Sequence, residues 1–226
     1  MSAVPTYPLR LEGELEPNLS RWLWLVKWIL ALPHFVVLVF LYIGSVLATI
    51  WAFFVLLFGG SYPRGIFNYN VGVLRWTWRV GFYCCTAIGT DKYPPFTKAE
   101  VADYPAHLEM TYPEDQRHGL PLIGWWLAGI PQYMISGILT GGGIGLFFRY
   151  GYGGLIGVLV LVAGVLLLFT KSYPRGIFDL IMGFNRWVFR VTAYASLMTR
   201  EYPPFRLDQG GDDPGVSPVP AATVSA

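Results

Sequence analysis

Two pairs of arginines, each pair spaced one helical turn apart, are the residues whose types and spacing best suit a defined chemistry. Arg75 and Arg79 form the first pair, and Arg186 and Arg190 form the second. A tryptophan follows the leading arginine of each pair. Guanidinium groups bind phosphate through two parallel hydrogen bonds, and tryptophan favours the membrane–water interface. The pattern therefore predicts contact with lipid headgroups or with a partner protein.

Two further arginines, Arg64 and Arg175, each follow a proline at the predicted end of a hydrophobic segment, where headgroup phosphates would be within reach. Two other interpretations stay open. The arginines could anchor a helix at the membrane boundary without selecting a lipid, or Arg186 or Arg190 could pair internally with Asp179. The complete predicted headgroup or partner site is Arg64, Arg75, Trp76, Arg79, Arg175, Arg186, Trp187 and Arg190.

Other reactive side chains form no catalytic pattern. His34, His107 and His118 are scattered without metal-ligand spacing, and the sequence has no phosphate-binding glycine loop or nucleophile elbow. The adjacent Cys84 and Cys85 are interpreted as packing thiols, because a disulfide between neighbours is sterically awkward. We therefore expect a protein that is not an enzyme and that holds no metal and no cofactor.

Composition places these residues in an integral membrane protein. Of the 226 residues, 54% are hydrophobic and 13% are charged, whereas soluble domains carry about 25% charged residues. A single membrane crossing needs about 20 apolar residues. The net charge of +2 gives no indication of nucleic-acid binding. Three long stretches are almost free of charge: 22–58, 120–139 and 150–170.

The chain contains two copies of one unit, which together cover roughly residues 7–96 and 104–205. The heptapeptide Ser-Tyr-Pro-Arg-Gly-Ile-Phe occurs identically in both copies, and the match continues through both arginine pairs to a shared Tyr-Pro-Pro-Phe. Upstream, Pro33 matches Pro131, so His34 corresponds to Gln132. A shared mechanism that needs an imidazole is therefore disfavoured. The matched motifs lie at 61–67 and 172–178, and at 93–96 and 202–205.

Each copy is predicted to form a hydrophobic hairpin followed by an amphipathic interfacial helix. The first copy, 1–96, would have its hairpin at 22–58, turning at Gly44 and Ser45, and its helix at 66–88. The second copy, 97–206, would have its hairpin at 120–170 and its helix at 177–198. Short alternating runs at Leu9 to Glu12 and at Ala106 to Glu109 could be strands that pair with each other. The tail, 207–226, is expected to be disordered.

The lengths of the two copies favour an even number of crossings in each. From Pro33 to Tyr62 there are 28 intervening residues, and from Pro131 to Tyr173 there are 41. The second copy thus has 13 extra residues, which we place at its glycine-rich turn. Arginine and lysine gather on the cytoplasmic side, which predicts a mainly α fold with about four crossings and both termini cytoplasmic. The first hairpin has short arms, so it could thin the bilayer or form a shallow wedge that does not reach the far leaflet. The rival for the first copy is one long helix with an interfacial first half, broken at Pro33.

The repeated motifs resemble a known family. The run from Leu19 to His34, the Tyr-Pro-Arg-Gly-Ile-Phe motif, the Arg-Trp-x-x-Arg-Val motif and Tyr-Pro-Pro-Phe are similar to the bacterial membrane family called domain of unknown function 4389. The resemblance covers nearly the whole chain in two copies. The second copy departs from it in its first helix, at Pro121, Gly124 and Gln132. The resemblance implies a bacterial membrane protein, often with tandem copies, and implies no activity. Together with the predicted topology, we expect a multi-pass protein of the bacterial cytoplasmic (inner) membrane.

These observations favour a non-catalytic membrane protein that acts as a scaffold or as an accessory subunit of a bacterial membrane complex. Its expected partners are membrane lipids and other membrane protein subunits, and nucleic acid is not expected. Two alternatives remain. One is a small transporter or channel that acts as an oligomer, although few polar residues are available to line a pathway. The other is a protein that binds anionic lipid through its arginines.

Overall fold

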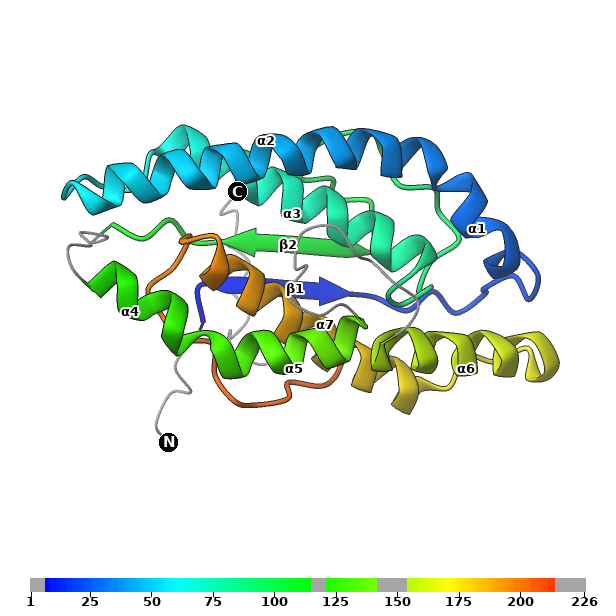
Figure 1. Ribbon diagram of the computed structural model, residues 1–226. Coiled ribbons are helices and arrows are strands. Elements are labelled where there is room, and N and C mark those ends of the chain that lie inside the picture. The colour runs from blue at the N-terminus through cyan, green and yellow to red at the C-terminus, as the bar shows by residue number, and fades with distance from the viewer. Residues whose placement is uncertain (1–6, 115–120, 142–153, 214–226) are drawn as a thin grey trace, which may run out of the picture.

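A computed structural model describes residues 7–114, 121–141 and 154–213 (Figure 1). The described chain is mainly helical, with seven helices and one two-stranded sheet. Each element of the first copy has a counterpart in the second. The elements are β1 (Leu9–Gly13), α1 (Trp24–Leu30), α2 (Leu32–Leu57), α3 (Arg64–Cys84), β2 (Ala106–Met110), α4 (Pro121–Ala128), α5 (Ile130–Thr140), α6 (Leu155–Thr170) and α7 (Arg175–Ala195).

The sheet joins the two copies at the centre of the molecule. β1 pairs antiparallel with β2, and Leu11 lies directly opposite Leu108. The prediction that these two runs form strands that pair with each other is therefore confirmed. Successive side chains of a strand point to opposite faces, so Leu9 and Leu11 are buried while Arg10 and Glu12 stay partly exposed. One face of the sheet is apolar, and the other is polar.

The predicted hairpin in the first hydrophobic segment is wrong, because α2 runs as one helix through Gly44 and Ser45. These small residues pack α2 against α3 instead of forming a turn. A Cβ at Gly44 would overlap the hydroxyl of Tyr69, and the Ser45 hydroxyl donates to Asn70 Oδ1 at 2.7 Å. The helix begins with Pro33 in its first turn, where proline is tolerated. A single long helix broken near Pro33, the rival interpretation, describes this segment.

In the second copy, α5 and α6 together correspond to α2. Figure 1 shows them following one another along one line. Gly141 ends α5 in the left-handed conformation, at φ 72°, and a Cβ on Gly154 would overlap the backbone of Thr140 and Gly141. The end of α5 therefore meets the start of α6. The extra residues of this copy fall between these helices, and the predicted glycine-rich turn there lies largely outside the described residues.

The two predicted amphipathic helices exist as α3 and α7, and each begins after a proline in extended conformation. They do not lie at the molecular surface as interfacial helices would. α3 packs against β2 on one side and α2 on the other, and α7 packs against β1 and against both α5 and α6. Most of α3 and about half of α7 are buried. The sheet and the outer apolar helices cover them.

The two copies share one hydrophobic core beneath the apolar face of the sheet. Trp78 of α3 lies 5.6 Å from Phe189 of α7 between ring centroids, and Phe82 lies 6.1 Å from Phe178. These contacts join α3 and α7 directly. At the end of α3, Cys84 and Cys85 form a buried disulfide. The prediction that they are packing thiols is therefore wrong.

Candidate functional site

Arg186 of α7 is fully buried and binds four carbonyl oxygens. Its Nε donates to the carbonyl of Leu11 in β1 at 2.8 Å. Burial lowers the pKa of this guanidinium, and the nearby carboxylate of Asp213 opposes the shift. The other donors are directed at the segment that follows Tyr-Pro-Pro-Phe, where they bind the carbonyls of Asp208, Gly210 and Gly211 at 2.8, 2.6 and 2.7 Å.

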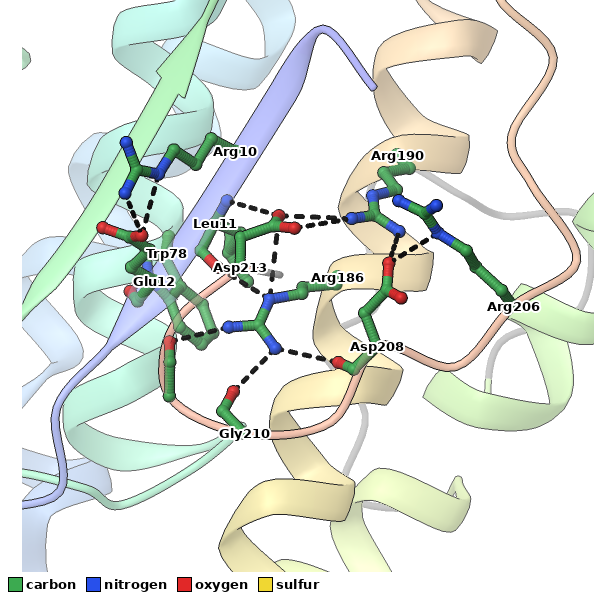
Figure 2. Close-up of polar contacts among 11 residues, drawn as sticks. Arg10, Leu11, Glu12, Trp78, Arg186, Arg190, Arg206, Asp208, Gly210 and Asp213 are labelled. Carbon is green, nitrogen blue, oxygen red and sulfur yellow. Dashed lines mark hydrogen bonds and ion pairs between the residues drawn. The ribbon is translucent and has the colours of Figure 1, made fainter. Parts of the chain in front are cut away.

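Arg190, one turn further along α7, holds two carboxylates of the same segment (Figure 2). Its guanidinium lies 2.6 Å from Asp208 and 3.1 Å from Asp213. The internal ion pairs of these arginines are therefore formed with Asp208 and Asp213 and not with Asp179. The expectation that the whole tail is disordered is wrong for 207–213, because these residues pack onto α7 through the two arginines. Residues 214–226 lie outside the described part of the chain.

The first copy repeats this arrangement with Arg75 and Arg79 of α3. Arg75 donates from Nε to the carbonyl of Leu108 in β2 at 3.0 Å and forms an ion pair with Glu100. Arg79 binds the carbonyls of Thr97 and Ala99 at 2.9 and 2.8 Å. In both copies the arginine pair thus binds the segment after Tyr-Pro-Pro-Phe and one strand. That strand belongs to the other copy in each case.

These contacts satisfy the outer edges of the sheet. A two-stranded sheet has two unpaired edges, and exposed edges promote pairing with other chains. Along β1, Arg186 covers the carbonyl of Leu11, the amide of Leu11 donates to Asp213 at 3.5 Å, and the amide of Gly13 donates to the Gly211 carbonyl at 3.1 Å. Along β2, Arg75 covers the carbonyl of Leu108. The arginines therefore act as structural staples.

Equivalent tyrosines also form hydrogen bonds from one copy to the other. Tyr7 precedes β1, and its hydroxyl donates to the carbonyls of Arg190 and Glu201 at 3.3 and 3.2 Å. Tyr104 precedes β2, and its hydroxyl donates to the carbonyls of Arg79 and Lys92, both at 3.3 Å. Burial raises the pKa of both tyrosines well above the ordinary value, so both remain neutral donors at physiological pH.

The two predicted tryptophans also point inward. Trp76 donates its indole N–H to Nδ1 of His34 at 3.0 Å, and Trp187 donates to Oε1 of Gln132 at 2.7 Å. His34 and Gln132 occupy matching positions, so both copies make the same contact with different acceptors. His34 also stacks on Phe96, with ring centroids 3.8 Å apart. In the structure, His34 therefore acts as the acceptor of the hydrogen bond from Trp76.

The predicted headgroup site is therefore not a single exposed site. Trp76, Arg79, Arg186 and Arg190 are buried and bonded within the protein, and the Arg75 side chain is only 17% exposed. Exposed cations remain at the matching Arg64 and Arg175. The sequence interpretation missed the partners Glu100, Asp208 and Asp213. The signal available for them was that acidic residues follow Tyr-Pro-Pro-Phe in both copies.

The surface feature that remains is apolar. Among the described residues, α2 is the one helix long and apolar enough, by length and composition, to cross a membrane, and α6 is a shorter apolar helix. The exposed side of α2 faces away from α3 and carries large hydrophobic side chains along its whole length. They are Leu32, Val36, Val39, Phe40, Ile43, Leu47, Ile50, Trp51, Phe54 and Leu57. On α6 the exposed set is Leu155, Val158, Leu161, Val162, Val165 and Phe169.

Polar side chains also line a hollow on the surface of the described chain. A hollow of about 940 Å³ beside the polar face of the sheet is lined partly by Arg10, Glu109 and Glu201. The described residues contain no group of three His, Cys, Asp or Glu side chains that could hold a metal ion. The exposed apolar helices are therefore the candidate functional surface of this protein.

Comparison with known proteins identifies a family but no relative of known activity. No curated protein and no solved structure matches the chain. The family described as Domain of unknown function (DUF4389) matches residues 21–98 and 146–206. These two segments agree with two copies of the domain, and each contains one arginine pair and its Tyr-Pro-Pro-Phe motif. The chain belongs to the family described as Domain of unknown function (DUF4389).

Proposed function

We propose that this protein is a non-catalytic membrane protein that acts as a scaffold or as an accessory subunit of a membrane complex. One observation carries the proposal, which is the uninterrupted apolar surface along the exposed side of α2. Phe40 is 70% exposed, Leu47 is 62% exposed and Trp51 is 64% exposed. Soluble monomers rarely expose contiguous apolar patches larger than a few hundred Å². Lipid or a partner helix must cover such a surface.

Lipid-headgroup contact is supported at two matching positions. Arg64 and Arg175 are exposed at the starts of α3 and α7, shortly after the ends of α2 and α6. Phe58 and Phe169, the matching aromatic residues that come before them, are 83% and 78% exposed. An exposed arginine shortly after the exposed apolar end of a helix suits the boundary between acyl chains and headgroups, because its long side chain can reach the headgroups from there. We propose that these positions, and not the buried arginine pairs, contact lipid phosphates.

The proposal is tested by vesicle flotation of the full chain. Replacing Phe40 and Leu47 with glutamate puts two charges on the apolar side of α2 and should reduce the membrane-bound fraction at least tenfold. Ala102→Glu with Thr111→Glu is the matched control, because both positions are exposed and lie outside the apolar helices. The control should bind vesicles as the wild type does. Equal binding by both variants, with unchanged circular dichroism spectra, would exclude α2 as the membrane-binding surface.

Anionic-lipid binding is the second candidate function, and the exposure of Arg64 and Arg175 favours it. Arg64→Gln with Arg175→Gln should lower retention of phosphatidylglycerol in native mass spectrometry and leave retention of phosphatidylcholine unchanged. Arg10→Gln is the control, because Arg10 pairs with Glu12 on the polar face of the sheet. Identical retention of both lipids by both variants would leave the arginines as anchors without lipid preference.

A further inference from the structure

We propose that α2 and the α5–α6 pair lie in the plane of the membrane, within one leaflet, and do not cross it. The inference deepens the proposed function, since it rests on the apolar helices meeting lipid. It also differs from the topology that hydropathy suggests, because α2 alone is long enough to span a bilayer. The polar groups beside this helix distinguish the two orientations.

The duplication fixes how the two apolar helices are related. β1 and β2 are equivalent strands that run antiparallel, with Leu11 opposite Leu108. Equivalent antiparallel strands are related by an approximate two-fold axis that passes between these two residues, perpendicular to the sheet. The same rotation relates α2 to α5–α6, and Figure 1 shows them running in opposite directions on either side of the sheet. A membrane normal along this axis puts both apolar helices at one depth.

A charged side chain, that of Lys98, lies beside the middle of α2. The Tyr69 hydroxyl donates to the carbonyl of Leu41, the tenth residue of this 26-residue helix, at 3.0 Å. The exposed Lys98 places its Nζ 4.4 Å from the centroid of the Tyr69 ring. At 1.5 Å per residue, Lys98 is therefore level with a point about 15 Å from the start of α2. In a crossing helix that point is near the bilayer centre, where a charge costs at least about 2.5–3.5 kcal/mol.

The sheet would also place charged side chains in the bilayer if α2 crossed it. Its strands run along the direction of α2 in Figure 1, so an upright α2 would carry the sheet into the bilayer as well. The polar face of the sheet would then place Arg10, Glu12 and the exposed Glu109 in hydrocarbon. When the two-fold axis lies along the membrane normal, these charges remain in water. α3 lies between β2 and α2, so the polar face is separated from the apolar helices by a full layer.

The signs of the charges identify the occupant of the apolar surface as a lipid leaflet. The sequence has no Asp or Glu from Pro17 to Thr90, a stretch that includes α1, α2 and α3. Arg64 is exposed at one end of this apolar surface, and Lys171 and Arg175 are exposed at the matching end of the second copy. Cations at both ends of an apolar face are complementary to anionic headgroups and repel the same cations of a second copy.

Depth measurement by spin labelling separates the two orientations. Nitroxides are placed one at a time at five exposed positions spread over about 39 Å of helix. The protein is reconstituted in vesicles of phosphatidylcholine and phosphatidylglycerol, and collision with oxygen and with a water-soluble nickel chelate reports depth. The wild type is the blank, because Cys84 and Cys85 are buried and joined. Ala102→Cys is the aqueous reference, and the five positions are Leu32, Phe40, Leu47, Phe54 and Phe58.

An in-plane helix should give nearly equal depths at all five positions, within about 5–10 Å of the headgroup boundary. A crossing helix would place Leu47 about 10–15 Å deeper than Leu32 and Phe58, because the hydrocarbon core is about 30 Å thick. That profile would overturn the in-plane inference and leave membrane binding intact. Nickel access at every position would instead overturn the proposed function. Spin–spin broadening that increases with the ratio of protein to lipid would show a second copy covering α2, which also overturns the inference.

A second measurement uses sidedness and does not depend on depth. An impermeant maleimide should label Arg21→Cys, Arg64→Cys and Lys98→Cys from the same side of sealed vesicles, because both ends of an in-plane α2 face one compartment. Labelling of Arg21→Cys and Arg64→Cys from opposite sides would overturn the inference. All three variants change partly or fully exposed side chains, and the staples of the core remain in place.

Discussion

Arg186 donates a hydrogen bond to the carbonyl of Leu11 at 2.8 Å, although 175 residues separate them in the sequence. Arg75 makes the matching contact with Leu108, which lies directly opposite Leu11 in the sheet. Each arginine comes from one copy of the repeat and binds the strand of the other copy. The duplicated halves are therefore tied to each other by their most polar side chains. We expect neither half to be stable without the other.

The buried staple should dominate stability. Arg186→Gln leaves four carbonyls without their charged donor and removes one of the two cations near Asp213, which keeps Arg190. Removing one partner of a buried charged network costs about 3–5 kcal/mol. Denaturant unfolding in mild detergent measures the change in the free energy of unfolding. Arg10→Gln, which removes only a partly exposed pair with Glu12, should cost less than about 1 kcal/mol. A similar small loss for Arg186→Gln would contradict its role as a staple.

The second copy predicts which substitution at His34 is tolerated. His34→Gln reproduces the acceptor that Trp187 has in Gln132, so the free energy of unfolding should change by less than about 1 kcal/mol. His34→Leu leaves the buried N–H of Trp76 without an acceptor and should cost about 1–3 kcal/mol. Adding Trp76→Phe to each variant completes a double-mutant cycle. Equal losses for the two His34 variants would show that stacking on Phe96, and not the hydrogen bond, selects this residue.

The junction between α5 and α6 predicts a deletion that should be tolerated. Removing residues 141–153 joins Thr140 to Gly154 in the register of α2, so the product should fold with unchanged helical content and bind vesicles normally. The control deletion, 142–153, leaves one extra residue and rotates α6 by about 100° relative to α5. That rotation turns the buried Ile156, Val160 and Ala163 away from the core and should destabilise the protein. Equal stability of both deletions would contradict the continuity of α5 and α6.

Burial of Tyr62 predicts a loss of stability in alkali. Burial raises the pKa of Tyr62 from 10.0 to about 12, and the Asn70 side chain that donates to its hydroxyl opposes the shift. The neutral phenol is favoured in the folded state, so its contribution is fully present below pH 10 and is lost as pH rises through about 12. The free energy of unfolding should therefore fall over this interval. Tyr62→Phe should make the fall shallower, and an unchanged slope would contradict the assignment.

Local sequence predicted the elements that depend on local pattern. The alternating run from Leu9 to Glu12 predicted a strand, and the internal repeat predicted a matching strand at Ala106 to Glu109 and its pairing partner. The prolines at 63 and 174 predicted the ends of the preceding hydrophobic segments. α3 and α7 begin directly after these prolines, two residues before the predicted starts at 66 and 177. Family membership followed from the same repeated motifs. These features depend on neighbours in sequence or on a comparison of the chain with itself, and both are visible without coordinates.

The segment itself did not decide whether α2 is continuous, because it fitted both a hairpin and one long helix. Gly44 and Ser45 in the middle of an apolar run suggested a turn, because hydropathy and small residues alone fit a hairpin. The contact with Tyr69 shows that a small residue is needed there for α3 to approach closely. Tertiary packing decided between helix and turn at this point.

The sequence by itself determined that the chain is a duplicated, apolar protein with two matched arginine pairs. Only the tertiary structure decided what those arginines contact. An isolated α3 would present Arg75 and Arg79 to solvent or lipid as a polar stripe, and an isolated α7 would present Arg186 and Arg190 in the same way. Folding brings the residues after each Tyr-Pro-Pro-Phe and the strand of the other copy against that stripe, because buried guanidinium groups and unpaired strand edges both require hydrogen-bond partners. No local pattern encodes the meeting of segments so far apart in the chain.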